Sequence, residues 1–540
     1  MSLALDARRG LAAPAPVWLA AAGIVALAAA VQLSFGMMAD VAWLIHCDER
    51  WLDGALPYRD FLELNPPASL WLYWPAVALA RRLGSPSEAV VSAFGFAAAL
   101  SAIGVSALIL RGVRGAGAGL ALAALAALLL LPGQTFCERD HLAAVFGVPF
   151  LALALARARG ATPGVALAAA AGLGCGAMAA IKPPYALIAA LLALYQLRRS
   201  GWRAVLRSPE YYVAAALGLA YVAAVAPLFP AYIANELPFN AEVYVAVREP
   251  LAALVASPGA MTFLLIALTA AWAARGRWAE PEFAIALLAA AGAGLAYLAQ
   301  GKGWVYQATP AMMYATLAAP VALPAAPLRG YAALLAGALA AAAAAPFGHN
   351  LGLAVGVGIA VGFGLDAARA GAALSLPRLA PFAFAAAVGA ACGLCTIERP
   401  TTPKLEALLA GLGPHLTLGT ISEDEGLGFP LVRRLHAVWA MRSHSLIVSD
   451  YVLRLSAQRP AEAARLAPFA KRDRANLVDD ITRRRPDALL VGPTGTALHA
   501  EVWADPRVQA AMADYAHVAT ERQPGYTAEL WLRKDFAARP

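Results

Sequence analysis

The sequence predicts an α-helical membrane protein with many spans and a small α/β domain at its C-terminal end. Of its 540 residues, 61% are hydrophobic and 14% are charged, whereas soluble domains carry about 25% charged residues. The charge is uneven, because residues 397–540 are polar and rich in Arg, Asp and Glu. We therefore expect a transmembrane domain over residues 1–396 and a separate domain, large enough for its own core, over residues 397–540.

Apolar runs that are long enough to cross a bilayer recur along the first 396 residues and predict about thirteen transmembrane helices. One further apolar piece, residues 66–80, is short and contains three prolines, so we interpret it as a juxtamembrane segment. The predicted spans are 16–36, 88–110, 117–132, 140–157, 163–181, 184–198, 211–229, 253–274, 281–299, 304–323, 330–346, 351–366 and 378–396.

The distribution of arginine predicts the topology. If residues 66–80 do not cross, alternate connections such as 111–115, 157–160 and 198–207 all carry Arg, and the opposite set is acidic or nearly neutral. The positive-inside rule then places the Arg-rich set and the N-terminus in the cytoplasm. It places the first loop, residues 37–87, and the C-terminal domain outside. The net charge of +8 reflects these loops and predicts no nucleic-acid partner.

The polar C-terminal region contains patterns of both strands and helices. Short apolar runs at 415–422 and 487–493 predict buried strands, and 527–534 predicts a final strand. The segments 462–484 and 508–518 have the periodicity of helices. A small α/β domain follows from this alternation.

The stretch from residue 37 to residue 67 holds six carboxylates against two arginines. It follows the first predicted span directly, so Asp40 is expected about one turn beyond the membrane. A carboxylate at that depth is a functional candidate. The alternative interpretation is an acidic, solvated loop between two helices. Among the other acids, Asp48, Glu49 and Asp53 are expected to face solvent or to hold the loop.

The remaining outer loops combine a charged cluster, Glu138-Arg139-Asp140-His141, with isolated cations at helix ends, Lys182, Arg248 and Lys302. A carboxylate suits a general base, and Lys or Arg suits a phosphate leaving group. Together they suggest group transfer from a lipid phosphate. The alternatives remain that Lys182 and Lys302 simply extend their ammonium groups to water and that Glu138 and Arg139 form a helix-end ion pair.

The first loop resembles that of the GT-C class of glycosyltransferases, and looks most like the branch that includes aminoarabinose transferase and the protein O-mannosyltransferases. The Glu138-Arg139-Asp140 cluster falls where this family has its second outer-loop motif, and residues 300–306 resemble the later segment that contacts the lipid phosphate. The residues of the first loop that match are Asp40, Trp43, Leu52, Gly54, Pro57, Tyr58, Asp60, Phe61, Pro66 and Pro67.

The resemblance implies a GT-C-like fold and an inverting transfer of a sugar from a polyprenyl-phosphate donor, with Asp40 as general base. The acceptor would be a lipid, a glycan or a protein, on the outer face of the bacterial inner membrane, with the multi-pass chain among membrane lipids and its C-terminal domain in the periplasm. No cofactor is expected, and a divalent metal is neither indicated nor excluded. The expected substrate and donor-phosphate contacts are Arg139, Lys182, Lys302, Tyr306, Glu138, Tyr58 and Arg248.

The sequence departs from the family pattern at two positions. Val41 replaces the acidic residue after the Asp, which weakens a metal or two-carboxylate mechanism. Asn65 replaces the Lys before Pro-Pro, so Lys182 or Lys302 would have to contact the phosphate instead. Two other functions therefore stay open, a transporter or flippase for a lipid-linked glycan and a non-catalytic assembly partner. The acid-rich loop and the sizeable outer domain favour the enzyme, and essentially no charged residue lies in the middle of a predicted span, where a transporter would have one.

Overall fold

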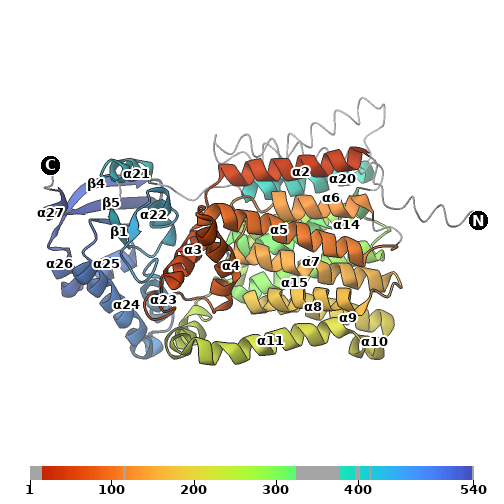
Figure 1. The fold of residues 1–540 in the computed structure, drawn as a ribbon, viewed down its shortest axis with the longest axis horizontal. Coiled ribbons are helices and arrows are strands. Elements are labelled where there is room, and N and C mark those ends of the chain that lie inside the picture. The colour runs from red at the N-terminus through yellow and green to blue at the C-terminus, as the bar shows by residue number, and fades with distance from the viewer. Residues whose placement is uncertain (1–14, 114–116, 324–375, 396–401, 414, 538–540) are drawn as a thin grey trace, which may run out of the picture. The chain divides into compact units, whose positions relative to one another are not determined.

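The structure is a computed structural model, and it forms two compact units. The helical unit comprises residues 1–36, 92–222 and 249–397, and the sheet unit comprises residues 37–91, 223–248 and 398–540. Each unit is described by itself below. The structure describes residues 15–113, 117–323, 376–395, 402–413 and 415–537 (Figure 1).

The helical unit is built from the apolar runs. Among the described residues, five helices are long and apolar enough to cross a membrane, namely α2 from Val17, α5, α7, α11 and α15, so the chain is a polytopic membrane protein by the length and composition of its helices. Helix α5 begins in the sheet unit and α11 ends in it. The helices of the helical unit are α2 (Ala15–Ser34), α5 (Ser87–Ile109), α6 (Ala118–Leu125), α7 (Arg139–Ala158), α8 (Val165–Ile181), α9 (Ala186–Ser200), α10 (Trp202–Leu206), α11 (Pro209–Leu228), α13 (Leu251–Ala256), α14 (Pro258–Ala273), α15 (Pro281–Gln300), α16 (Val305–Thr316), α17 (Ala319–Ala322) and α20 (Leu376–Leu394).

The predicted spans coincide with these helices wherever the structure describes them. The span predicted at 117–132 is α6 continued by a π-helical turn, Ala126–Leu130. The spans predicted at 330–346 and 351–366 lie outside the described residues. The helices of the bundle are therefore confirmed in place, while the number of crossings stays a prediction.

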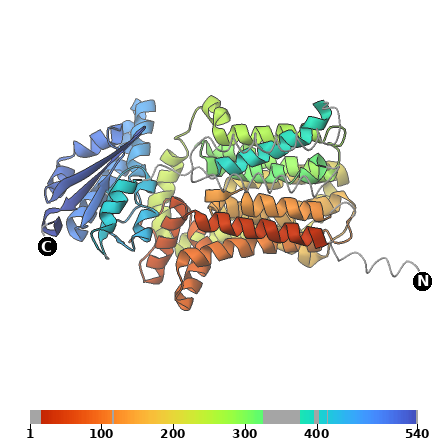
Figure 2. The same ribbon diagram turned by 90° about the horizontal axis from the view of Figure 1, so that it is seen from above.

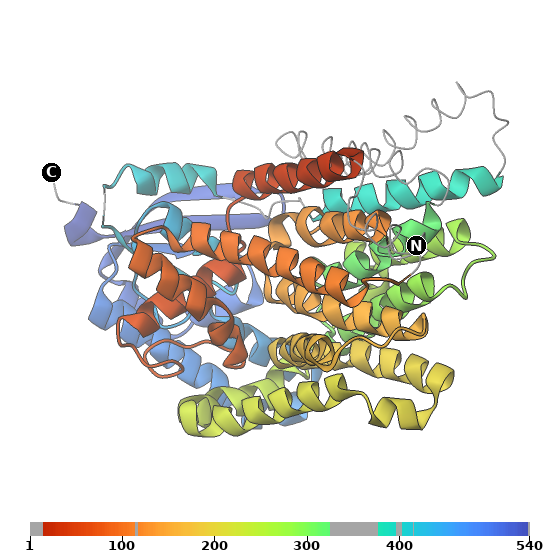
Figure 3. The same cartoon turned by 45° about the vertical axis from the view of Figure 1, so that its right-hand side comes forward.

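Small residues allow the helices of this unit to pack closely. Helix α7 lies against α8, and α15 lies against α9 and α16 (Figures 1 and 3). A Cβ atom at Gly172 would come within 2.5 Å of the carbonyl oxygen of Glu210, and one at Gly292 within 2.7 Å of the Cα of Ile188. These glycines therefore permit backbone approaches that a side chain would prevent, as is common where helices pack in lipid.

The C-terminal part of the sheet unit is the predicted α/β domain. Its five-stranded sheet has the order β2-β1-β3-β5-β4, with β1 parallel to β2 and β3, and with β5 antiparallel to β3 and β4. Figure 2 shows the strands as one twisted layer flanked by helices. The elements are α21 (Pro403–Ala410), β1 (Thr417–Ile421), α22 (Leu431–Arg434), β2 (Val438–Trp439), α23 (Ile447–Gln458), α24 (Ala463–Arg484), β3 (Ala488–Val491), α25 (Ala497–Trp503), α26 (Pro506–Met512), β4 (Tyr515–Gln523), β5 (Tyr526–Arg533) and α27 (Lys534–Ala537).

One helix of this domain was predicted wrongly. The segment 508–518 is helical only to Met512, and Tyr515 begins the edge strand β4. That strand pairs antiparallel with β5, which follows it after two residues, so strand pairing rather than the helical pattern decides its conformation. The strands predicted at 415–422, 487–493 and 527–534 and the helix at 462–484 are confirmed, with ends shifted by one or two residues.

The sheet unit also includes two segments from earlier in the chain. The first contains α3 (Ala39–Leu52) and α4 (Ala68–Leu83), the latter being the short apolar piece predicted as juxtamembrane. The second contains two π-helical turns, Tyr232–Glu236 and Asn240–Tyr244, around the short helix α12 (Leu237–Phe239). The last segment of the sheet unit, residues 398–540, therefore begins where the second domain was expected. The sheet unit is larger than that expected domain, because it also includes residues 37–91 and 223–248.

A hydrophobic core joins the second of these segments to the C-terminal domain. Phe239, Val243 and Val247 are buried against residues of α23 and α24. Among these, Leu455 and Leu466 are fully buried. Burial of this apolar surface is the main favourable contribution to such packing, so residues 223–248 are an integral part of the sheet unit.

Candidate functional site

Helix α3 carries Asp40, the residue predicted as general base. The helix begins at Ala39, which places Asp40 in its first turn with only 9% of its surface exposed. A carboxylate in that position interacts favourably with the helix dipole. One turn further on, Trp43 is buried and donates a hydrogen bond from Nε1 to Oε2 of Glu63 at 2.5 Å. This face of α3 therefore packs inside the unit, and the alternative of a solvated acidic loop does not describe it.

The loop after α3 is held by its own polar groups. Tyr58 has a positive φ of 63°, is fully buried, and donates from its hydroxyl to the carbonyl of Asn65 at 2.8 Å. The amide of Asn65 in turn donates to Oε1 of Glu63 at 2.5 Å. Both Tyr58 and Asn65 therefore stabilise the conformation of the loop, including the position at which the family pattern has a Lys.

Of the three acids that were expected to face solvent or to hold the loop, Glu49 and Asp53 match the expectation and Asp48 does not. Glu49 accepts both terminal nitrogens of Arg433, and Asp53 is an exposed partner of Arg81 at 2.7 Å. Asp48 is wrongly predicted to be solvated or to hold the loop, since it is fully buried and neither carboxylate oxygen has a hydrogen-bond partner among the described residues. Burial, and then the charges of Glu49 and Glu63, raise its pKa well above the usual value. Burial therefore disfavours the charged form of Asp48, and nothing in this environment marks it as the base.

The C-terminal domain contacts α3 directly. Arg433 forms a bidentate pair with Glu49, at 2.7 and 2.9 Å, and its Nε also contacts Glu88 at the start of α5. The ring of Trp43 lies 5.3 Å from the rings of both Phe429 and His444. The helix that carries Asp40 is thus oriented by residues nearly 400 positions later in the chain.

In the helical unit, Lys182 is the centre of a second polar cluster. Helix α8 ends at Ile181, and Lys182 is extended, so its side chain leaves the helix axis. Its Nζ lies 2.5 Å from Oδ2 of Asp140 and 3.4 Å from Oε1 of Gln300. It also lies 5.2 Å above the ring of Tyr306, within cation–π distance. Tyr185 donates from its hydroxyl to the other oxygen of Asp140.

The charged cluster at the start of α7 is also an ordered part of the protein. Glu138 is the N-cap of that helix and accepts the backbone N–H of Asp140 at 2.7 Å. It forms an ion pair with Arg139 at 3.3 Å, and both side chains are buried. His141 accepts from the backbone N–H of Cys137 at Nδ1, and its Nε2 lies 2.8 Å from the carbonyl of Leu128. Glu138 and His141 therefore have structural partners, and the helix-end ion pair of Glu138 with Arg139 is present.

The segment between α15 and α16 brings further polar groups into the helical unit. Lys302 is 8% exposed and follows Gly301, whose φ of 71° ends α15. The ring centroids of Trp304 and Tyr306 lie 5.5 Å apart, with the two rings tilted by 31°. The next residue, Gln307, is fully buried, and its amide has no hydrogen-bond partner in the described part of the chain. An unsatisfied buried amide is costly, which makes Gln307 an additional candidate for contact with a ligand.

The predicted site residues thus divide between the units. Asp40, Tyr58 and the exposed Arg248 belong to the sheet unit, and the predicted residues of the helical unit are Glu138, Arg139, Lys182, Lys302 and Tyr306. The structure brings Lys182 and Tyr306 together. It adds Asp140, Tyr185 and Gln300, which were not predicted as site residues. Asp140 and Gln300 lie within the two later motifs of the sequence analysis, and Tyr185 follows Lys182 closely, so their positions gave a signal. Among the described residues, no group of three His, Cys, Asp or Glu side chains could hold a metal ion.

Neither a family model nor a curated protein matches the chain. The comparison with solved structures does give a match, and it shows which known fold the chain resembles over nearly its whole length. The structure matched is ArnT from Cupriavidus metallidurans bound to undecaprenyl phosphate, with 16% sequence identity, a TM-score of 0.54, and coverage of 98% of this chain and 100% of that chain. At this identity the likeness establishes the fold.

A second solved structure, ArnT from the same organism in the apo state, is 16% identical, with a TM-score of 0.48 and coverage of 88% of this chain and 89% of that chain.

Proposed function

We propose that the protein is a membrane glycosyltransferase that moves a sugar from a polyprenyl-phosphate donor to a lipid, glycan or protein acceptor. The observation that carries the proposal is the likeness in fold to ArnT over nearly the whole chain, since the ArnT structure holds undecaprenyl phosphate. The buried carboxylate of Asp40 and the cations of the helical unit supply the groups that such a transfer needs. The Arg asymmetry of the loops supports a reaction on the outer face of a bacterial inner membrane.

Asp40 is proposed as the general base. A sugar or lipid hydroxyl is too weakly acidic to attack at neutral pH, so its proton must pass to a base as its oxygen bonds to the anomeric carbon. The bond from that carbon to the phosphate oxygen breaks at the same time, and the electron pair leaves with the polyprenyl phosphate. Attack from the face opposite the leaving group inverts the configuration. The step needs one carboxylate, and the leaving anion needs cations rather than a proton.

Lys182, Lys302 and Arg139 are proposed to stabilise the donor phosphate. Lys182 is held by Asp140 and by the ring of Tyr306, so its ammonium group is positioned before any donor arrives. Such preorganisation is the usual source of electrostatic catalysis, because no reorganisation is needed at the moment of reaction. A phosphate would then share the ammonium group with Asp140, and Tyr185 would continue to orient that carboxylate.

The test is the rate of sugar transfer by an Asp40→Asn variant, measured with a polyprenyl-phosphate sugar. The amide keeps the shape and removes the base, so turnover should fall by about 10²–10⁴-fold, while donor binding remains. Asp53→Asn is the matched control, because Asp53 lies on the same segment with its side chain 68% exposed. Wild-type turnover in Asp40→Asn would refute the role of Asp40, and movement of the donor across the membrane without transfer would favour a flippase.

The donor contacts are tested separately by Lys302→Ala and Lys182→Ala. Loss of a charged hydrogen bond typically weakens binding by roughly tenfold or more. Donor affinity measured with the purified protein should fall in each variant, with a smaller change in Arg248→Ala, since Arg248 is exposed. Unchanged donor affinity in Lys182→Ala, Lys302→Ala and Arg139→Ala would place the phosphate elsewhere.

A further inference from the structure

An open basin rich in arginine lies in the sheet unit, between the loop that follows α3 and the end of α24. It has a volume of about 370 Å³, within the range of roughly 300–1,000 Å³ that is typical of small-molecule sites. Arg59 lines it from the loop, and Arg442, Arg483 and Arg484 line it from the C-terminal domain. The proposed transfer uses none of these residues.

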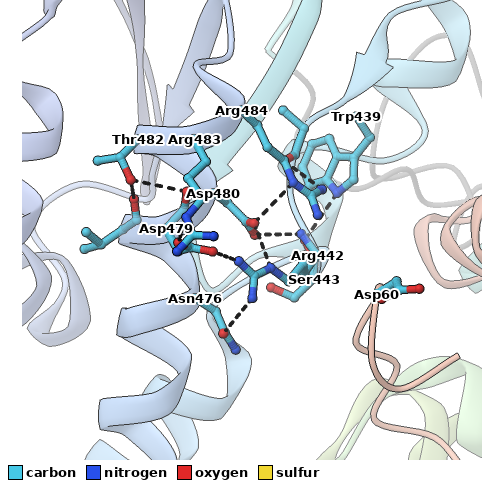
Figure 4. Close-up of polar contacts among 12 residues, drawn as sticks. Asp60, Trp439, Arg442, Ser443, Asn476, Asp479, Asp480, Thr482, Arg483 and Arg484 are labelled. Atoms are coloured by element: carbon cyan, nitrogen blue, oxygen red, sulfur yellow. Dashed lines mark hydrogen bonds and ion pairs between the residues drawn. The ribbon is translucent and has the colours of Figure 1, made fainter. Parts of the chain in front are cut away.

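The inner wall of the basin is rigid. Arg442 contacts Asp480 through both its backbone N–H, at 2.8 Å, and its Nε, at 2.9 Å, and its guanidinium group also contacts Asp479 and Asn476 (Figure 4). The carbonyl of Arg442 accepts the backbone N–H of Leu62 at 2.7 Å, which ties the loop to the domain. The arrangement of this wall is therefore set before any ligand binds.

The rim of the basin is held more loosely. The side chains of Arg59 and Arg483 are 65% and 80% exposed and pair with Asp60 at 3.0 Å and Asp479 at 2.5 Å. Exposed ion pairs of this kind contribute little to stability, so their guanidinium groups can turn to a ligand at small cost. A guanidinium group binds the oxygens of a phosphate in a bidentate manner.

The charges around the basin are not balanced. Arg50 lies behind it, donating from Nη2 to the carbonyl of Asp60 at 2.9 Å, while its buried Nη1 has no hydrogen-bond partner among the described residues. Burial lowers the pKa of Arg50, and the charge of the lining Arg484 lowers it further. The four lining arginines and Arg50 thus outnumber the carboxylates that line the basin in the described part of the chain, which are Asp60, Asp479 and Asp480.

A network that only fastened the loop to the domain would require neither an open volume nor an excess of cations. The carbonyl end of α24 opposes an anion, but Arg483 and Arg484 in its last turn offset that partial charge. We propose that the basin binds a phosphate-type oxyanion, either free in solution or in the head group of a lipid. The proposal is independent of sugar transfer, because none of the residues that line the basin takes part in the proposed transfer.

The experiment uses the full chain in nanodiscs and compares Arg483→Gln with Arg454→Gln. Both arginines are exposed and pair with a carboxylate one turn earlier on their helix, but Arg454 does not line the basin. Inorganic phosphate is titrated in discs of phosphatidylcholine, and binding is read by calorimetry. We expect Arg483→Gln and Arg59→Gln each to weaken phosphate binding by about tenfold, and Arg454→Gln to leave it unchanged.

A second arm identifies the source of the oxyanion. The thermal midpoint of the wild type is compared in discs of phosphatidylcholine and in discs that contain phosphatidylglycerol. A rise with phosphatidylglycerol that Arg483→Gln abolishes assigns the basin to a lipid head group, and a phosphate response alone assigns it to a free ion. The proposal is overturned if the wild type responds to neither probe, or if Arg454→Gln loses as much as Arg483→Gln, since the effect would then be general surface charge.

Discussion

The two units treat buried charge differently. In the helical unit, each of three cations faces one nearly buried carboxylate: Arg157 with Glu210 at 2.7 Å, Arg159 with Glu282 at 2.5 Å, and Lys182 with Asp140 at 2.5 Å. In the sheet unit, single arginines are shared, as Arg433 is by Glu49 and Glu88. When one member of a one-to-one buried pair is removed, the other is left as an isolated buried charge. When a shared arginine near the surface is removed, water can hydrate the carboxylates that it contacted. We therefore expect the helical unit to be the less tolerant of charge removal.

The largest effect is expected for Asp140→Asn. The change removes the only carboxylate that pairs with Lys182 among the described residues, and the carboxylate is fully buried. Breaking a buried pair costs about 3–5 kcal/mol, so the free energy of unfolding of the purified protein should fall by that amount. The double variant Asp140→Asn with Lys182→Gln should recover part of the loss. If Asp140→Asn were as stable as the wild type, the expected difference between the two units in their tolerance of charge removal would be wrong.

Glu236 is an exception within the sheet unit, because this buried carboxylate pairs with a cation as the buried carboxylates of the helical unit do. It is 4% exposed and pairs with Arg472 at 3.2 Å. Burial raises its pKa from 4.5 to about 7; Arg472 lowers that pKa, and the nearby charges of Asp473 and Glu63 raise it. Because the pKa is higher in the folded state, the contribution of this group to stability is fully present below about pH 4.5 and is lost as the pH rises through about 7.

Glu236→Gln removes this pH dependence. The stability of the wild type, measured relative to that of the variant, should decline by at most about 3 kcal/mol between pH 4.5 and pH 8. Asp473, whose pKa is raised to about 6, chiefly by burial, should act in the same direction. A difference between wild type and variant that grew in favour of the wild type with rising pH would contradict the assignment.

Two adjacent arginines on α22 allow a matched comparison, for which we expect an effect of intermediate size. Arg433 joins α22 to α3 and to the start of α5 and is 13% exposed at its side chain, whereas Arg434 is 46% exposed and pairs only with Glu406 among the described residues. Arg433→Gln should cost about 2 kcal/mol, the value of charged hydrogen bonds, and Arg434→Gln at most about 1 kcal/mol. Equal midpoints in chemical unfolding of the two variants would show that the shared arginine has no special role.

The smallest effect is expected for Arg454→Gln. Its partner Asp450 lies one turn earlier on α23 at 2.9 Å, and the arginine side chain is 52% exposed. Helical pairs of this kind contribute about 0.3–0.5 kcal/mol, so the thermal midpoint should hardly change. A large loss would mean that exposed pairs of the sheet unit are as sensitive as the buried pairs of the helical unit.

Much of the helical unit could be predicted from the sequence, because a membrane helix is determined by its own apolar run. The sheet unit was harder, because its strands depend on the partners with which they pair. The edge strand β4 has few apolar residues and exists through pairing with β5, the strand that follows it. The two-residue strand β2 is too short to give a pattern and is held by β1.

The candidate site shows the same limit. Asp40, Lys182 and Tyr306 could be selected from their residue types and positions, and the structure shows that the last two lie together. Their partners could not, because Asp140, Tyr185 and Gln300 reach Lys182 from the start of α7, the turn before α9 and the end of α15. Likewise, the burial of Asp48 could not be predicted from the acidic sequence around it.

The three-segment composition of the sheet unit also has a consequence for the order in which the protein is made. Glu49 and Arg433 are separated by 384 positions, and Glu236 and Arg472 by 236. During synthesis, α3 and residues 223–248 therefore emerge long before the domain that covers their buried acids and apolar side chains. Partly synthesised chains of this kind expose hydrophobic surface until the covering domain has been made, and they are prone to misassembly. We expect nascent chains that end before residue 398 to be unstable, and the arrival of the C-terminal domain to act as the checkpoint of biogenesis.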